Sequence, residues 1–188
     1  MFPAALPPDK RCENMHEYPF YLTELQKRFG EKIEAIAMPH GQAVATIKRA
    51  ALNAALLYLR DDDKTLFDLF VDLTAVDYIA RQPRFEVVIH LVSIPLRHRI
   101  RLKVRLDEDD PVMPSITPVY PSADWFEREC YDLYGIRFEG HPNLKRILLY
   151  DGFVGHPLRK DYPIDQRQPR VELRKPEVRR NDQSVEPK

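Results

Sequence analysis

Residues 84–92 and 98–106 give the clearest strand signals along the chain. Apolar residues recur at every second position in both, and in 84–92 the positions between them also include Val88 and Val92, so both faces of that strand are expected to be partly covered. A period of two places successive side chains on opposite faces of a strand, so both stretches are predicted to be strands. Residues 93–97 are a suitable length for a turn, which predicts that the two strands are antiparallel neighbours. In the second strand the aliphatic residues are expected on one face of the sheet and four basic residues on the other: Arg99, Arg101, Lys103 and Arg105.

The other periodic segments complete a small α+β domain. They predict helices over 19–29 and 49–60, a hairpin of strands 33–38 and 42–47 across Pro39-His40-Gly41, and a strand over 66–76. A further helix follows the three later strands. This order predicts a two-layer α+β sandwich, in which a mixed sheet carries helices on one face and is followed by an extended C-terminal segment.

The last helix is expected between Ser122, a candidate N-cap, and Gly135, a candidate C′ residue. Its apolar face, at i, i+4, i+7 and i+8 spacing, is formed by Phe126, Cys130, Leu133 and Tyr134. Glu127, Arg128 and Asp132 are expected mostly on the opposite side, where Arg128 and Asp132 are close enough to pair. An exposed pair of this kind contributes only about 0.2–0.5 kcal/mol, so helix stability alone does not explain the Glu127-Arg128-Glu129 cluster.

Beyond Gly135 the helical pattern stops, and Gly-His-Pro triplets follow at 140–142 and 155–157. Proline favours extended geometry in the residue before it and glycine permits sharp turns, so each triplet predicts a bend. The segment carries basic residues beside many apolar ones, including the run 147–150. So much apolar surface on an irregular segment requires a cover, which its own domain or another protein could supply.

Composition narrows the possible functions. The 29 basic and 29 acidic residues leave no net charge, so no overall basic field favours nucleic acid or anionic lipid. Cys12 and Cys130 lack ligand spacing, so no iron–sulfur cluster is expected on this chain alone. The N-terminus lacks a secretory-signal pattern, and the most apolar run, 50–59, is far shorter than the roughly 20 residues that span a bilayer. These features predict a soluble or peripheral protein.

Several single features allow a second interpretation. The basic strand face could bind nucleic acid, but no aromatic residue is interleaved with it, so a solvated or protein-facing surface is the alternative. His141 and His156 could bind metal, yet the absence of ligand spacing favours hydrogen bonding within the bends or at an interface. Glu127 and Glu129 point to different sides of a helix, which argues against paired-carboxylate catalysis. One of them, with Arg128, is instead expected to lock the helix onto the following loop.

Three long motifs resemble one known family. The spacing of Glu127-Arg128-Glu129, Asp132-Leu133-Tyr134, His141, Lys145, Ile147 and Leu148 closely resembles the signature of the 30-kilodalton subunit family of respiratory complex I. The run GHPLRKDYP at 155–163 is equally characteristic of that family, and FDLFVDLTAVDY at 67–78 resembles its core. The resemblance covers roughly residues 66–164, with Asn143 and Lys145 where Asp and Arg are more usual.

The resemblance implies a cofactor-free structural and assembly subunit in the peripheral arm of a proton-translocating NADH:quinone oxidoreductase. The protein would lie on the cytoplasmic side of a bacterial inner membrane and would reach the membrane only through the complex. Its implied partners are the hydrogenase-like, D-type subunit that forms the quinone site and the B-type subunit that bears an iron–sulfur cluster, while FMN and the other clusters also belong to other subunits. The equivalent subunit of a related membrane hydrogenase or of a dehydrogenase with another electron donor is an alternative, as is a nucleic-acid-binding α+β domain.

These expectations divide the chain into a loose N-terminal segment 1–17, an α+β domain 18–135, an extended partner-binding segment 136–164 and a polar tail 165–188. The tail is expected to be disordered without a partner. No catalytic, cofactor-binding or metal-binding residue is predicted. The expected partner interface comprises Glu127, Arg128, Glu129, Asp132, His141, Lys145, Arg146, His156, Arg159, Lys160 and Asp161.

Overall fold

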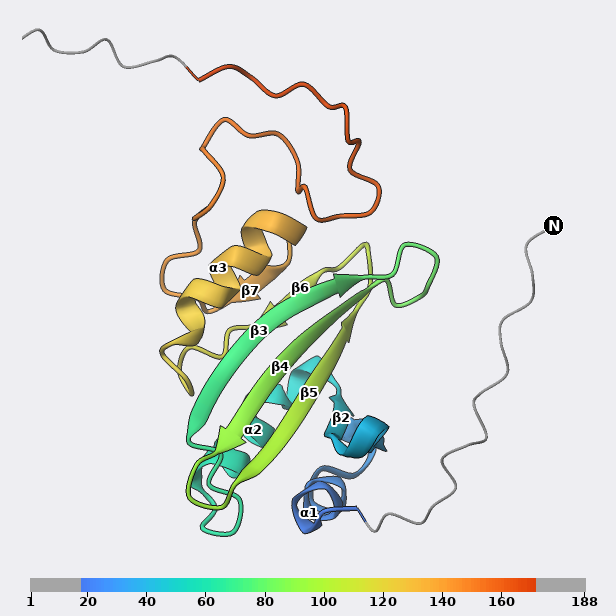
Figure 1. The fold of residues 1–188 in the computed structure, drawn as a ribbon, viewed down its shortest axis with the longest axis vertical. Helices are drawn as coiled ribbons and strands as arrows, with labels where there is room; N and C mark the ends of the chain where they lie inside the picture. The colour runs from blue at the N-terminus through green and yellow to red at the C-terminus, as the bar shows by residue number, and fades with distance from the viewer. Residues whose placement is uncertain (1–17, 172–188) are drawn as a thin grey trace, which may run out of the picture.

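The computed structural model describes residues 18–171, which fold around a five-stranded sheet (Figure 1). The expectations for 1–17 and for the tail beyond 171 lie outside the described residues. The sheet strands are β1 (Ile33–Ala37), β2 (Ala43–Ile47), β3 (Leu69–Asp77), β4 (Phe85–Ser93) and β5 (His98–Leu106). The α-helices are α1 (Phe20–Phe29), α2 (Leu52–Asp61) and α3 (Ala123–Tyr134), with 3-10 turns at Gly30–Lys32, Pro39–Gly41 and Arg49–Ala51.

The strands lie in the order β1-β2-β5-β4-β3. Both predicted hairpins are present, because β1 pairs antiparallel with β2 and β4 pairs antiparallel with β5 along nine residues. Strand β2 lies parallel to β5, and β3 lies antiparallel to β4. The sheet is therefore mixed, as predicted.

One face of the sheet carries the hydrophobic core and the helices. Inward side chains of β4 and β5, such as Ile89 and Leu102, pack with Leu25 of α1, Leu56 of α2 and Cys130 of α3 in one cluster. Figure 1 shows α2 behind β4 and β5. The basic residues of β5 alternate with the buried aliphatic ones and lie on the other face, which confirms the predicted two-layer α+β sandwich.

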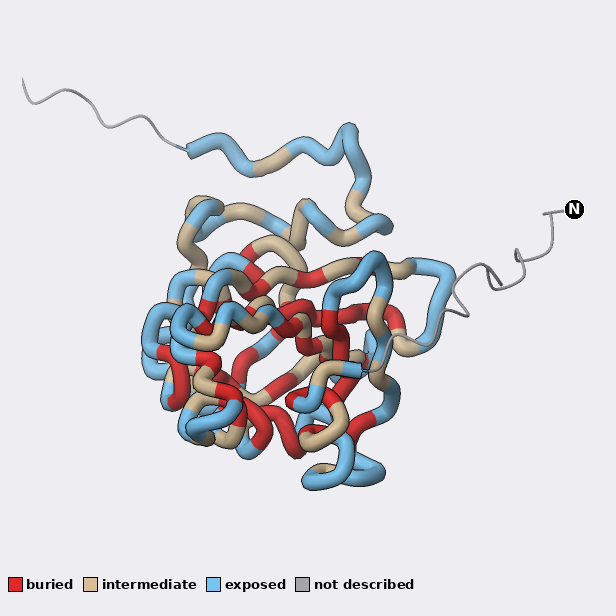
Figure 2. The backbone as a smooth tube through the Cα atoms, turned by 60° about the horizontal axis from the view of Figure 1, so that its bottom comes forward, coloured by how far each residue is buried: buried red, intermediate tan, exposed pale blue. Residues whose placement is uncertain are grey.

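A second, two-stranded sheet was not predicted. Its strands β6 (Val112–Pro114) and β7 (Arg137–Glu139) pair in parallel and are three residues each, too short to produce a periodic pattern. Ile136 and Phe138 are buried in the main core. The domain boundary expected at 135/136 thus falls just before a strand that packs against the domain. Figure 2 shows that the chain after β7 is mostly exposed or half-buried.

Helix α3 lies against β3. The Phe126 ring packs edge-on against Phe70 at 5.3 Å between ring centroids, and the buried thiol of Cys130 lies 3.9 Å from the carbonyl oxygen of Leu73. The helix ends at Tyr134, and the next residue, Gly135, has a φ of 75°, the left-handed conformation expected of a C′ glycine. The capping role expected for Ser122 was wrong, since its backbone is already helical and its side chain makes no capping bond. Within residues 18–171, no helix is both long and apolar enough to cross a membrane.

Candidate functional site: the carboxylates of α3 and the segment they hold

Two acidic residues of α3 are completely buried, contrary to the expectation that they face solvent. The relative exposure of both Glu127 and Asp132 is 0%. The helical pattern correctly placed them away from the apolar face. However, two other parts of the chain fold over that polar side, one before the helix and one after it, and bury the carboxylates.

Glu127 holds the chain that precedes α3. Its carboxylate accepts hydrogen bonds from the Ser115 hydroxyl and the Ile116 N–H, both at 2.7 Å. His141 Nε2 lies 3.9 Å from the same carboxylate and 2.9 Å from Asp124 Oδ1. Burial raises the pKa of Glu127 to about 7, although the two donors lower it. The carboxyl is therefore half-protonated near neutral pH.

This pKa predicts a pH-dependent stability. The folded protein retains the Glu127 proton up to about pH 7, whereas an unfolded glutamic acid, with a pKa of 4.5, loses it earlier. The folded state binds more protons between these values, so the contribution of Glu127 to stability falls by up to about 3 kcal/mol as the pH rises through this window. Urea unfolding at pH 5 and pH 8 should show this loss for the native protein and not for Glu127→Gln. Parallel pH profiles of native protein and variant would contradict the assignment, and the exposed Glu129→Gln is the control.

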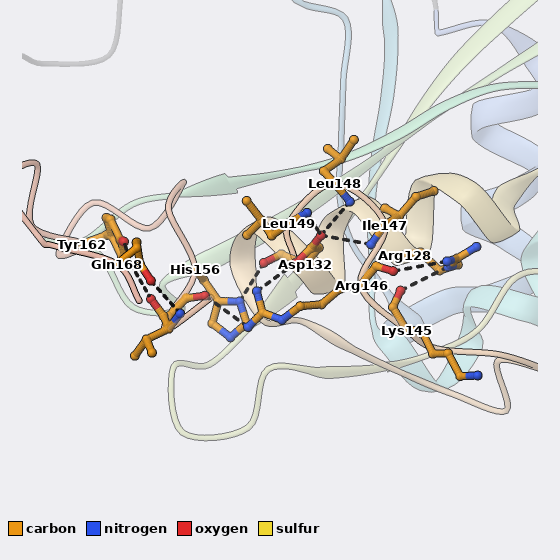
Figure 3. Close-up of polar contacts among 12 residues, drawn as sticks. Arg128, Asp132, Lys145, Arg146, Ile147, Leu148, Leu149, His156, Tyr162 and Gln168 are labelled. Atoms are coloured by element: carbon orange, nitrogen blue, oxygen red, sulfur yellow. Dashed lines mark hydrogen bonds and ion pairs between the residues drawn. The ribbon is translucent and has the colours of Figure 1, made fainter. Parts of the chain in front are cut away.

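Asp132 holds the chain that follows α3 (Figure 3). One oxygen, Oδ2, accepts the consecutive backbone N–H groups of Ile147, Leu148 and Leu149 at 2.9–3.0 Å, and Oδ1 accepts Arg146 Nη1 at 3.0 Å. Burial raises the pKa of this carboxyl, but the three N–H groups and the guanidinium together hold it below its ordinary value. Asp132 is therefore a charged anchor that fixes an otherwise irregular stretch of backbone.

Arg128 contributes to the same attachment in a way that differs from the expected pair with Asp132. Its Nε donates to the carbonyl oxygen of Lys145 at 3.1 Å and its Nη2 donates to that of Arg146 at 3.3 Å. The pair expected from the i, i+4 spacing does not form, because Asp132 is already satisfied by the loop. The expectation that Arg128 locks the helix onto the following loop is confirmed. The glutamate beside it, Glu127, locks the preceding segment instead.

The second Gly-His-Pro triplet and the residues after it satisfy the last carbonyl groups of α3. His156 Nδ1 lies 2.8 Å from the Asp132 carbonyl oxygen, Leu158 N–H donates to that of Leu133 at 3.1 Å, and Arg159 Nε donates to that of Tyr134 at 2.6 Å. A Cβ atom on Gly135 would lie 2.6 Å from His156 Nε2. Glycine is thus required there both by its positive φ and by the close approach of this segment.

The first triplet is also fixed by its histidine. His141 Nδ1 accepts the N–H of Asn143 at 3.0 Å, and its other ring nitrogen faces Asp124. Both histidines are thus engaged in hydrogen bonds, as expected from their positions in bends. Among residues 18–171, no group of three or more His, Cys, Asp or Glu side chains is arranged to hold a metal ion.

Sequence reasoning missed Arg84, the most strongly engaged side chain of this region. Its side chain is 4% exposed and forms two 2.8 Å hydrogen bonds with Asp77, a 2.7 Å bond with Asp161 and a further ion pair with Glu108. The N–H of Lys160 also donates to Asp77 at 2.8 Å. Arg84 therefore fastens the end of the GHPLRKDYP run to the sheet. No local pattern marks it, since these partners lie 7, 24 and 77 residues away.

The structure separates the eleven expected interface residues into two groups. Eight use their side chains within the chain: Glu127, Arg128, Asp132, His141, Arg146, His156, Arg159 and Asp161. The other three, Glu129, Lys145 and Lys160, are exposed, and no described residue forms a side-chain hydrogen bond or ion pair with them. Exposed apolar side chains accompany these three on α3 and the segment: Trp125, Leu148, Val154, Leu158 and Ile164.

The sequence of the chain is similar to that of one known protein family. A family model described as the 30 Kd subunit of respiratory-chain NADH dehydrogenase matches residues 45–168. The C subunit of the NADH-quinone oxidoreductase of Sinorhizobium medicae is 48% identical over 152 residues, which are 81% of this chain and 74% of that protein. The C subunit from Caulobacter vibrioides is 56% identical over 124 residues, 66% of this chain and 62% of the relative. The match to a second Caulobacter relative, strain K31, spans 51% of its length.

Solved structures share the fold. A trypsin-resistant fragment (1-134) of Nqo5 superposes with a TM-score of 0.57 at 30% identity, covering 65% of this chain and 97% of the fragment. A chain of the membrane-bound sulfane sulfur reductase, an archaeal respiratory membrane complex, gives a TM-score of 0.62 at 23% identity, with 76% of this chain and 84% of that chain covered. At that identity the second likeness concerns the fold alone.

Proposed function

Because the chain belongs to the family of the 30-kilodalton subunit of respiratory-chain NADH dehydrogenase, we propose that it is a structural subunit in the peripheral arm of a proton-translocating NADH:quinone oxidoreductase. In this role the chain holds neighbouring subunits in place and supplies no catalytic residue or cofactor of its own. FMN and iron–sulfur clusters would belong to other subunits, and activity would belong to the complex.

The observation that carries the proposal is the attachment of the irregular segment 140–163 to α3 and the sheet. Seven of the expected interface side chains form intramolecular bonds there, while apolar residues such as Leu148 and Leu158 remain exposed on the fixed backbone. An isolated domain gains little from holding exposed apolar side chains in a fixed conformation. A docking surface gains affinity, because less conformational entropy is lost on binding when the backbone is already ordered.

The partners proposed for this surface are the D-type subunit that forms the quinone site and the cluster-bearing B-type subunit. Glu129, Lys145 and Lys160 would form polar contacts around the apolar residues, the usual arrangement of a protein–protein interface. The proposed location is the cytoplasmic side of a bacterial inner membrane, with contact to the membrane only through the complex.

Native purification of the tagged chain from its own membranes tests the proposal. Recovery of a large complex that contains D-type and B-type subunits and reduces quinone with NADH is the expected result. Recovery of the chain alone, under conditions that keep such complexes intact, would refute it.

Replacement of Leu148 by aspartate should separate docking from folding. The side chain is 62% exposed, so the change should alter the free energy of unfolding by no more than about 0.5 kcal/mol. Burial of the new carboxylate against a partner should reduce the yield of assembled complex at least tenfold. The matched control is Ile79→Asp, in the β3–β4 loop and 55% exposed, which should assemble normally. Equal loss of assembly in both variants, or a matching loss of thermal stability, would contradict the docking role of Leu148.

A complex with another electron donor is the second candidate. The fold alone does not select the electron donor, because a chain of the archaeal sulfane sulfur reductase shares it. The purified complex distinguishes the two candidates by the reductant it accepts: NADH for the first, and a different donor with no response to NADH for the second.

A further inference from the structure

The outer face of the main sheet is left uncovered by residues 18–171. All three helices pack on the inner face, and Figure 1 looks onto the outer face at β3, β4 and β5. This face carries the basic row of β5, which the proposed function above does not use. The row therefore calls for a separate explanation.

Half of the basic row is neutralised within the chain. Lys103 Nζ lies 2.7 Å from Glu86, and Arg105 lies 3.6 Å from Glu34 and 4.0 Å from Glu86. Glu86 is only 3% exposed, because these two long side chains cover it. This end of the row is a satisfied ion-pair cluster and has little charge left for a partner.

The other half is not neutralised. No carboxylate of the described residues lies within 4 Å of Arg99 or Arg101. Arg101 is instead held in place by neutral groups, since its Nε donates to His90 Nε2 at 2.8 Å and its Nη2 donates to Gln42 Oε1 at 3.0 Å. Burial and the neighbouring Arg101 lower the pKa of His90, so the ring acts as an uncharged acceptor that orients the guanidinium.

These two arginines border a groove with an apolar floor. Its lining includes two cross-strand pairs of β4 and β5, Val92 with Arg99 and His90 with Arg101. A bulge in β3 brings Val71, 46% exposed, into its wall. The volume is about 240 Å³, below the range of roughly 300–1,000 Å³ typical of cofactor and small-molecule pockets. The groove is large enough for a side chain.

We propose that this groove docks an acidic segment of a partner protein, with a carboxylate between Arg99 and Arg101 and an aliphatic side chain against Val71 and Val92. A carboxylate matches the fork of donors that a guanidinium presents, and the fixed Arg101 loses little freedom on binding. The site is separate from the docking surface of α3. The groove lies near the Leu69 end of β3. The segment that carries the other docking surface is bonded to Asp77 at the opposite end of β3, roughly 26 Å away along the strand.

A single acidic side chain fits this face better than a nucleic acid does. Sheets that bind single-stranded nucleic acid present aromatic side chains on which the bases stack. The outward positions of β3, β4 and β5 carry no aromatic ring other than the imidazole of His90. Asp72, whose carboxylate lies 3.9 Å from His90 Nδ1, would repel a run of phosphates. Individual carboxylates on an extended peptide can avoid it.

Fluorescence anisotropy with the full chain and a labelled peptide of sequence Glu-Leu-Glu-Ser-Glu-Leu-Glu-Ser tests the proposal. We expect saturable binding that weakens with salt, at least tenfold weaker binding by the double variant Arg99→Gln/Arg101→Gln, and no binding of the matched Gln-Leu-Gln-Ser peptide. The exposed Lys48→Gln is the charge control and should bind like the native chain. If thermal melting shows that the double variant is unfolded, Arg99→Gln alone should weaken binding at least threefold.

Three results would overturn the proposal. These are equal binding of a twelve-residue oligothymidine, unchanged peptide affinity in a folded arginine variant, and equal loss of affinity in the Lys48 control. The first would assign the face to nucleic acid. The α3 variant Leu148→Asp should leave peptide affinity unchanged, so failure of this inference and failure of the proposed function are distinguishable.

Discussion

Arg84→Ala is expected to destabilise the protein by about 3–5 kcal/mol, the typical loss when one partner of a buried charge pair is removed. The substitution leaves the fully buried Asp77 carboxylate with only the N–H of Lys160 as a donor. It also releases Asp161, so the chain from Asp161 to Pro163 should loosen from the sheet and become more sensitive to protease. Urea unfolding measures the first effect and limited proteolysis the second.

The pH dependence of this loss identifies its cause. Hydrogen bonding with Arg84 lowers the pKa of Asp77, so the stability that this carboxylate contributes is present above its unfolded pKa of 3.8 and is lost as the pH falls through its folded pKa. The difference between native protein and Arg84→Ala should therefore shrink below about pH 4. Arg81→Ala, in the neighbouring exposed loop, is the control and should change stability by less than about 0.5 kcal/mol. A pH-independent difference would indicate lost packing rather than an unpaired carboxylate.

Asp132→Asn is expected to release the loop after α3 while leaving the main sheet folded. The buried carboxylate accepts three backbone N–H groups and the Arg146 guanidinium. An amide of the same shape has one acceptor oxygen, and its NH₂ group must face donors. Depending on how the amide is turned, either the Arg146 bond or the three N–H bonds are lost, and the bonds that remain are no longer charge-assisted. The attached loop should therefore be destabilised by about 3 kcal/mol or more.

Hydrogen exchange measures this effect residue by residue. The amides of Ile147, Leu148 and Leu149 should lose protection in Asp132→Asn, by a factor of about 100 for 3 kcal/mol, while those of β4 and β5 keep theirs. Asp151→Asn changes an exposed aspartate of the same segment and should leave exchange unaltered. Uniform loss of protection across the sheet would show that Asp132 supports the whole fold rather than the loop. Reduced assembly in Asp132→Asn with normal sheet protection would further link the ordered loop to the proposed docking role.

The five strands of the main sheet and the three α-helices followed from local patterns, because each of them packs against a single core. Strict alternation in β5 identified both its apolar side and its basic side, and the bounds of β5 agree with the prediction at both ends. The end of α3 followed from Gly135 for an equally local reason, the left-handed conformation of a C′ residue. The family resemblance also rested on residues within one continuous stretch, and the match to residues 45–168 confirms it.

The burial of Glu127 and Asp132 and the role of Arg84 depended on the tertiary structure. The periodicity of hydrophobic residues shows which side of a helix or strand faces the core. It carries no information about a loop, distant in sequence, that covers the polar side in the folded chain. Asp132 meets its donors 14 to 17 residues away, and Arg84 meets Asp161 across 77 residues. The sequence by itself thus determined the sheet, the helices and the family. Only the folded chain decided which signature residues act inside the molecule and which face a partner, because that division is made by contacts between segments far apart in sequence.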